Sequence, residues 1–205
     1  LYQKFGGTMF RLIFIMLIFC SSFSQGTTHI LLFDLNQDGG KISLSNMNKI
    51  THEDVYNNQP SFSLDGKSIY YVSKRDGEQT DIFQYQLKSS KSIQKTHTKE
   101  SEYSPLEFQK NFCSAVRVDQ DGKQRLYKIN LKKEKAELLH KNTKGVGYYA
   151  WVNEHTIAFF HIEKPFHLRL IDTKTGDWKR IVNNIGRSLI HDPQADENIY
   201  FIRNY

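Results

Sequence analysis

The sequence predicts an all-β fold made of repeated antiparallel units. Short runs of β-branched and aromatic residues dominate the chain, and no long window shows the apolar spacing of a helix. Four apolar cores recur with their first residues 44, 44 and 42 positions apart: Ile69–Val72, Cys113–Val116, Ile157–Phe160 and Ile199–Ile202. A four-stranded blade with its turns uses about this many residues, so we predict a β-propeller of four-stranded antiparallel blades, with about four blades present.

Each repeat carries further segments of strand character. The alternating segments that partner the cores are Ile30–Leu35, Ile82–Leu87, Leu126–Leu131 and Leu168–Asp172. The more polar segments that end the repeats are Asn48–Thr51, Ile93–Thr96, Ala136–Leu139 and Trp178–Val182. Buried inner strands and half-polar outer strands are expected in blades that stack around an axis.

Glycines and prolines fall between these segments. Glycine accepts a positive φ without a Cβ clash, so hairpin turns are expected where Asp-Gly or a similar pair separates two strands. The expected turns are Asp38-Gly39, Asp65-Gly66, Asp76-Gly77, Asp121-Gly122 and Thr175-Gly176. Pro60, Pro105 and Pro193 fall just ahead of three inner strands, where a missing N–H donor is tolerated.

The N-terminal stretch has the order of a secretory signal peptide. Arg11 precedes the apolar run Leu12–Cys20, and Ser22-Phe23-Ser24 supplies small residues before Gln25. We therefore expect residues 1–24 to hold upstream residues and the signal peptide, and residues 25–205 to form the propeller domain. A membrane anchor is disfavoured because the run is less than half the ~20 residues that span a bilayer. Lipid attachment at Cys20 stays an alternative, although the preceding Phe19 is bulky.

The chain is basic, with a net charge of +6 and an isoelectric point of about 9.2. Basic residues crowd between Lys123 and Lys144. Nucleic-acid binding would need that charge on one face with interleaved aromatic residues, and the export signal argues against it. A charged strand edge that resists edge-to-edge pairing is the preferred explanation, and no nucleic-acid partner is expected.

No pattern in the sequence predicts a catalytic, cofactor-binding or metal-binding residue. Cys113 lies in an apolar strand and is interpreted as a small buried hydrophobe. The eight histidines are scattered and are interpreted as surface or strand-edge residues, and the Gly-x-Ser-x-Gly nucleophile motif does not occur. Asp34-x-Asn36-x-Asp38-Gly39 fits half of a calcium loop, but its twelfth position is Ser45 in place of a bidentate glutamate, so a structural turn is preferred.

The segment Pro60–Lys67, followed by Ile69-Tyr70-Tyr71 and Ser73–Gly77, resembles the TolB-type β-propeller repeat. It departs from that repeat at Leu64, where proline is usual. Later repeats keep only parts of the pattern, such as Pro105 and Trp151, and the resemblance covers residues 30–205. Proteins with this repeat include periplasmic TolB-like proteins, outer-membrane-associated proteins of Bacteroidetes type, and the propeller half of prolyl-oligopeptidase-like serine peptidases.

The resemblance implies an exported, non-catalytic, monomeric scaffold, periplasmic or secreted. It would bind a protein partner of the periplasm or outer membrane without a cofactor, and would have no transmembrane span after signal cleavage. The alternative is the substrate-gating propeller of a serine peptidase whose catalytic domain lies beyond Tyr205.

Ring closure stays open at this stage. The N-terminal repeat begins with an outer strand pair and the C-terminal repeat ends with an inner pair, so the two could share one composite blade and close four blades. We prefer the alternative that the chain is part of a six- to eight-bladed ring, because four blades is the lower limit for propellers.

The export hypothesis predicts cleavage between Ser24 and Gln25. N-terminal sequencing of protein recovered outside the cytoplasm should give a start within a residue or two of Gln25. Exported protein that still begins at Met9 would contradict the hypothesis.

Overall fold

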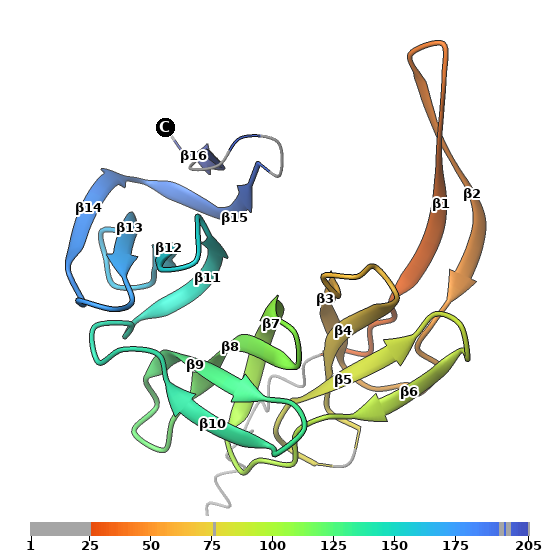
Figure 1. The fold of residues 1–205 in the computed structure, drawn as a ribbon, viewed down its shortest axis with the longest axis horizontal. Coiled ribbons are helices and arrows are strands. Elements are labelled where there is room, and N and C mark those ends of the chain that lie inside the picture. Colours follow the sequence, from red (N-terminus) through yellow and green to blue (C-terminus); the bar gives the residue numbers. More distant parts are fainter. Residues whose placement is uncertain (1–25, 76, 193–194, 196–197, 205) are drawn as a thin grey trace, which may run out of the picture.

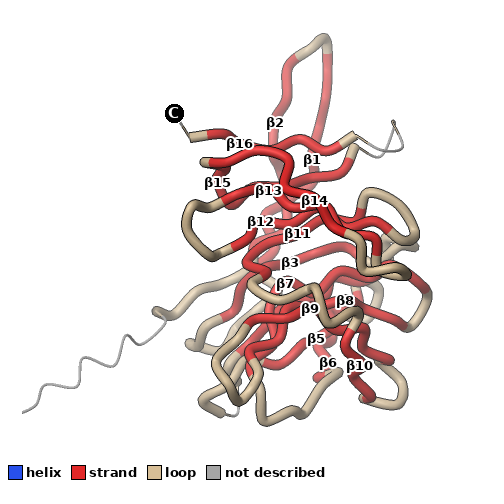
Figure 2. Tube along the Cα trace, turned by 90° about the vertical axis from the view of Figure 1, so that its left-hand side faces the viewer, coloured by secondary structure: helices blue, strands red, loops and turns tan. Residues whose placement is uncertain are grey.

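The structure, a computed structural model, describes residues 26–75, 77–192, 195 and 198–204. These residues form sixteen strands joined by turns and loops, with no helix among them (Figure 2). None of the described segments is therefore a helix able to cross a lipid bilayer. The predicted signal peptide and its cleavage site lie outside the described residues.

Three four-stranded antiparallel sheets follow one another along an arc (Figure 1). Blade A comprises β3 (Asn57–Phe62), β4 (Ser68–Ser73), β5 (Asp81–Gln86) and β6 (Lys91–Gln94). Blade B comprises β7 (Ser101–Gln109), β8 (Phe112–Val118), β9 (Gln124–Asn130) and β10 (Lys135–Leu138). Blade C comprises β11 (Val146–Trp151), β12 (Thr156–His161), β13 (His167–Asp172) and β14 (Trp178–Asn183). The four-stranded antiparallel blades predicted from the sequence are confirmed.

A two-stranded hairpin lies at each end of the arc (Figure 1). The N-terminal hairpin pairs β1 (Leu31–Asp38) with β2 (Lys41–Lys49), and the C-terminal hairpin pairs β15 (Ile185–His191) with β16 (Ile199–Arg203). The two hairpins form separate sheets, so the described residues contain three whole blades and no closed ring. The total number of blades stays a prediction.

Apolar side chains fill the space between neighbouring blades. Tyr70 and Ile82 of blade A pack with Cys113 and Ile129 of blade B in one cluster. A second cluster joins blade B to blade C, and two more join the end hairpins to blades A and C. Cys113 is completely buried and burial raises the pKa of its thiol, which confirms it as a structural hydrophobe.

The innermost strands carry bulges at two prolines. The register of β3 shifts between Asn58 and Ser61, and Gln59 has a φ of 54°. The register of β7 shifts in the same way at Pro105. We predicted that these prolines precede the inner strands, and that was wrong. Both lie inside the strands, where a bulge removes the need for their missing N–H. Pro193 lies outside the described residues.

The bulges connect neighbouring blades through hydrogen bonds. Ser104 N donates to Gln59 Oε1 at 2.7 Å, and Ser61 Oγ donates to the carbonyl oxygen of Pro105 at 2.5 Å. Between blades B and C, the Tyr149 hydroxyl donates to Ser114 Oγ at 2.8 Å. Paired polar groups of this kind fix the rotation of one blade against the next.

Four of the five expected glycine turns are confirmed. Gly39, Gly66, Gly122 and Gly176 all have positive φ and lie between paired strands. Gly77 lies in the connection between the paired strands β4 and β5, where the fifth turn was expected, and Asp76 lies outside the described residues.

The turn at Gly66 gives a stability prediction. Replacing Gly66 with Val should destabilise the domain by more than about 1 kcal/mol, because a β-branched residue is strained at a φ of 66°. Gly66→Asn is the matched control, since asparagine tolerates this conformation, and it should lose less. Equal thermal midpoints for Gly66→Val and the parent protein would rule out the turn as assigned.

Glu102 is a buried acid at the start of β7. Its carboxylate accepts a hydrogen bond from Thr96 Oγ1 at 2.5 Å, while Oε1 has no partner within the described residues. Burial raises the pKa of this carboxyl to about 7. The group therefore ionises near neutral pH in the folded protein and near 4.5 in the unfolded chain.

Stability should consequently fall as pH rises from about 4.5 to about 7, by up to about 3 kcal/mol from this group. Above its unfolded pKa the unfolded chain loses this proton, whereas the folded protein keeps it until about pH 7. Glu102→Gln should remove this part of the pH dependence in chemical unfolding measurements. The exposed Glu78→Gln is the control, and equal pH profiles for the two variants would contradict the assignment.

Candidate functional site

The candidate site lies on the inner side of the arc, which the first strands of the blades (β3, β7 and β11) form, and at one end of these strands (Figure 1). We call this inner surface the channel wall. Because neighbouring strands are antiparallel, two kinds of connection share this end: those from second to third strands, and those from one blade to the next. We call this end the mouth. A cavity of about 490 Å³ opens there, lined by Tyr56, Gln59, Tyr103, Gln124, Tyr148, Phe160, Phe166 and Arg187, among others.

A second cavity, of about 530 Å³, adjoins the first. Tyr148 and Arg187 line both cavities, so the two form one continuous surface that we call the channel groove. The second cavity extends over Ser104 and Tyr149 to the C-terminal hairpin, where Tyr200 is 59% exposed. The groove thus combines aromatic surface with a single cationic side chain, Arg187.

Phenol groups dominate the mouth end of the groove. Tyr56 precedes β3, Tyr103 lies in β7 and Tyr148 lies in β11, so three successive blades each contribute one. Burial raises the pKa of the Tyr56 hydroxyl, and the phenols of Tyr103 and Tyr148 raise it further. Tyr56 therefore stays neutral at physiological pH, and all three residues line the same cavity. A neutral phenol offers an apolar ring together with a hydrogen-bonding tip.

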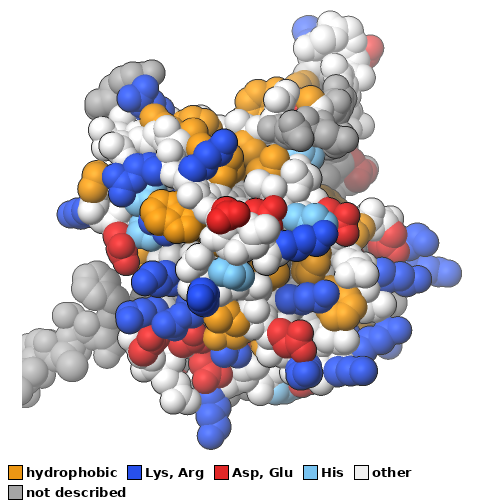
Figure 3. Space-filling view, turned by 60° about the vertical axis from the view of Figure 1, so that its left-hand side comes forward, with side chains coloured by type: hydrophobic (Ala, Val, Ile, Leu, Met, Phe, Trp, Pro, Cys, Tyr) orange, Lys and Arg blue, Asp and Glu red, His pale blue; other side chains and the backbone are white. Residues whose placement is uncertain are grey.

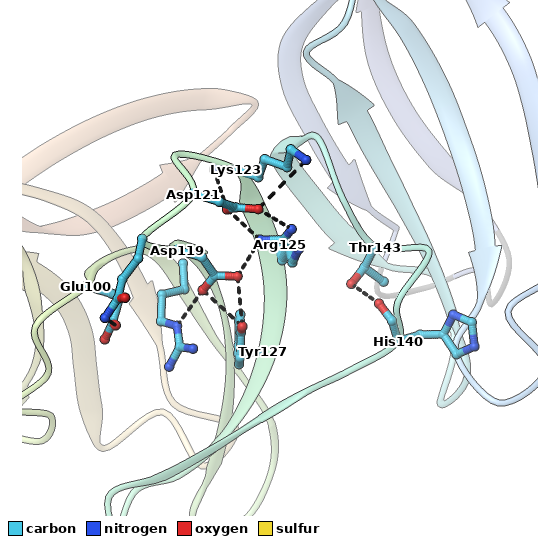
Figure 4. A network of polar contacts seen from close by, with 10 residues as sticks. Glu100, Asp119, Asp121, Lys123, Arg125, Tyr127, His140 and Thr143 are labelled. Carbon is cyan, nitrogen blue, oxygen red and sulfur yellow. Dashed lines mark hydrogen bonds and ion pairs between the residues drawn. The ribbon is translucent and has the colours of Figure 1, made fainter.

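An ion-pair network stiffens the rim of the mouth (Figure 4). Arg125 bridges two carboxylates of the turn between β8 and β9, with Nη1 2.6 Å from Asp119 and Nη2 2.7 Å from Asp121. Arg117 Nε and the Tyr127 hydroxyl also bind Asp119, at 3.0 and 2.9 Å. The hydrogen bonds from Arg125, and next that from the backbone N–H of Lys123, hold the pKa of Asp121 well below its usual range.

The network fixes residues that line the mouth. Val118 directly precedes Asp119, and Gln124 directly precedes Arg125, and both side chains contact the cavity. Bidentate arginine–carboxylate pairs combine strength with defined geometry. The mouth therefore has a wall that is largely formed before any ligand binds.

A buried histidine pair lies beside the groove in blade C. His161 and His167 stack with ring centroids 4.5 Å apart, and Arg169 Nη2 is 3.3 Å from His167 Nε2. The interpretation of the histidines as surface residues is therefore wrong for these two, which are 1% and 2% exposed. Burial, with Arg169 next, lowers the pKa of His161 to about 4, so this imidazole stays neutral at physiological pH.

The half-motif for calcium is part of the N-terminal hairpin. Asp34 and Asn36 lie along β1 and bond to Asn46 and Ser45 of β2, so the expected structural turn is confirmed. Within the described ranges no group of three or more His, Cys, Asp or Glu side chains is placed to hold a metal ion.

The sequence analysis assigned no binding role to any residue of the channel groove. One signal was available, because Tyr103 and Tyr148 stand opposite equivalent core residues, Val116 and Phe160, in successive blades. Tyr56 and Arg187 carry no such signal, since Tyr56 lies in the connection before β3 and Arg187 lies where the pairing of β15 with β16 is irregular.

No protein-family model and no curated protein sequence matches the chain. Solved structures do match, and a TolB from Acinetobacter baumannii aligns with a TM-score of 0.55 and 16% identity. The alignment covers 75% of this chain and 41% of that TolB. An oligogalacturonate lyase from Vibrio parahaemolyticus aligns at a TM-score of 0.56 and 16% identity, covering 87% of this chain and 55% of the lyase.

A puromycin hydrolase aligns as well, with a TM-score of 0.56 and 12% identity, over 70% of this chain and 25% of the hydrolase. The chain thus spans only a quarter to about half of these proteins. At 12–16% identity the likeness shows a shared fold and no shared function. The matched proteins include enzymes, such as the lyase and the hydrolase. Together with the blades described above, these matches show that the chain has a TolB-like β-propeller fold.

Proposed function

We propose that this chain is a non-catalytic propeller domain of an exported protein, and that it binds a protein partner through the channel groove. The observation that carries the proposal is the set of three phenols, each from a different blade, along a pre-formed wall. Tyrosine and arginine are enriched where proteins contact one another, because each adds apolar area and hydrogen bonds to one contact.

The shape of the groove favours a flexible segment of the partner over a flat surface. A segment of a few residues fills two adjoining cavities of about 490 and 530 Å³ better than a folded domain does. Arg187, which lines both cavities, would pair with a carboxylate of that segment. A periplasmic or secreted location, a monomeric state and a partner of the periplasm or outer membrane belong to the same proposal.

The charge distribution also supports a protein partner over nucleic acid. Lys and Arg side chains alternate with Asp and Glu on the face shown in Figure 3, with apolar side chains between them. Nucleic-acid binding relies on many phosphate contacts from one continuous basic surface.

Site-specific photo-crosslinking tests the proposal. A photoreactive residue at Gln124, on the wall of the mouth, should crosslink one exported protein in the producing cell. The same residue at Lys91, on the outermost strand of blade A, is the control and should not. Adding Tyr148→Ala and Arg187→Ala should reduce the crosslinked product about tenfold, which corresponds to the loss of roughly 1.4 kcal/mol.

Two outcomes would contradict the proposal. Equal crosslinking from Gln124 and Lys91 would show that the groove is not the contact surface. Crosslinking of Gln124 to a serine-hydrolase segment of the same polypeptide would support the substrate-gating domain instead, for which the likeness to puromycin hydrolase is the supporting observation.

A further inference from the structure

A second groove lies at the end of the blades opposite to the mouth, between blades B and C. It is a cavity of about 650 Å³ formed by the ends of β7 and β11 and by the turns at Leu64, Asn153–His155 and Thr173. None of its lining residues contributes to the channel groove. We call it the aromatic groove.

Two stacked aromatic rings form its floor. Phe108 of blade B and Trp151 of blade C have ring centroids 4.8 Å apart and planes inclined by 22°. The indole is held in place, because Trp151 Nε1 donates to Ser114 Oγ at 2.9 Å. Both side chains are half-buried and line the cavity, so the groove has a fixed apolar platform.

Polar side chains with few internal contacts surround this platform. Lys128 Nζ lies 4.4 Å from the Phe112 ring centroid and 5.7 Å from that of Phe108, and it has no carboxylate within 4 Å among the described residues. Gln109 and Glu154 are exposed, and their side chains form no hydrogen bond in the described part of the chain. Only a distant contact of 3.7 Å joins Glu154 to His155.

The lining therefore mixes an amide, an amine and two carboxylates, Glu107 and Glu154, around an aromatic surface. Glu107 already accepts hydrogen bonds from the backbone N–H groups of Leu64 and Asn111, so the charged side chains left to meet a ligand are one of each sign. The opposite charges of Lys128 and Glu154 make the groove a poor site for a strongly anionic or cationic ligand. A pyranose ring matches it, since its C–H face packs on an aromatic ring while its hydroxyl groups donate to and accept from polar side chains at the edge.

We infer that the aromatic groove binds a neutral oligosaccharide, with pyranose rings packed on Phe108 and Trp151. Its volume accommodates a few sugar units, and Gln109, Lys128 and Glu154 would bond their hydroxyl groups. This inference is independent of the proposed protein partner, because the two grooves share no lining residue.

The chain contains two tryptophans, which makes the site directly observable. Trp178 lies on β14 and is 50% exposed, so Trp178→Phe leaves Trp151 as the single indole reporter. In that variant, a panel of neutral hexasaccharides of glucose, mannose, xylose and N-acetylglucosamine is titrated up to the low-millimolar range. At least one should change the Trp151 emission, and calorimetry should give the same affinity.

Surface variants separate binding from folding. Gln109→Ala combined with Glu154→Ala alters exposed side chains and should weaken binding about tenfold without changing the thermal midpoint. Glu78→Ala with Lys91→Ala is the matched control on blade A and should leave binding unchanged. Tyr148→Ala should also leave it unchanged, since Tyr148 belongs to the channel groove.

Three results would overturn the inference. The first is an unchanged emission and no heat with every neutral hexasaccharide. The second is binding confined to hexagalacturonate or to acidic or basic peptides, which would assign the groove to a charged ligand. The third is sugar binding that Tyr148→Ala abolishes while the Gln109 and Glu154 substitutions do not, which would place the sugar in the channel groove.

Discussion

The architecture depends on apolar contact between the faces of neighbouring blades. Each second strand is buried on both faces, so Tyr71 and Phe159 are completely inaccessible to solvent although they lie in different blades. Burial of a large apolar side chain contributes roughly 1.5–3 kcal/mol, and every blade buries several. Because the contact is non-directional, hydrogen bonds at the bulges, such as Ser104 N to Gln59 Oε1, must set the rotation between blades.

The difference between apolar contacts, which follow the repeat, and hydrogen bonds at the bulges, which do not, explains what the sequence could and could not predict. The repeat of about 44 residues follows from the apolar cores, and it correctly located the second strand of each whole blade and of the C-terminal hairpin. The channel groove depends on where bulges and blade connections place Tyr56, Tyr103 and Arg187. The position of these residues in the sequence does not predict that they lie together. His161 was misassigned because a polar residue that follows an apolar core normally marks the exposed end of a strand, whereas here both faces of β12 are covered up to its last residue.

The two end hairpins differ from the whole blades in how their apolar residues are covered. The N-terminal hairpin packs against blade A only at its base, where Ile30 and Ile50 join the cluster of Tyr71, and the C-terminal hairpin packs against blade C through Ile185. Away from these contacts large apolar residues stay exposed, including Ile42 at 69% and Ile190 at 63%. Contiguous apolar surface of this kind mediates association in soluble proteins. The aromatic groove rests on residues of the whole blades, whereas the channel groove includes part of this exposed surface at Ile190 and Tyr200 of the C-terminal hairpin.

The hydroxyl of Ser114 connects the two grooves. Its oxygen accepts hydrogen bonds from the Tyr149 hydroxyl at 2.8 Å and from Trp151 Nε1 at 2.9 Å, and it donates to the carbonyl of Leu106 at 3.2 Å. Tyr149 lines the channel groove and Trp151 forms the floor of the aromatic groove. Ser114 itself is completely buried, and a buried donor that loses its acceptor costs about 1–3 kcal/mol. A single side chain in the middle of blade B thus fixes one aromatic ring in each groove, and neither ring can shift without disturbing this hydroxyl.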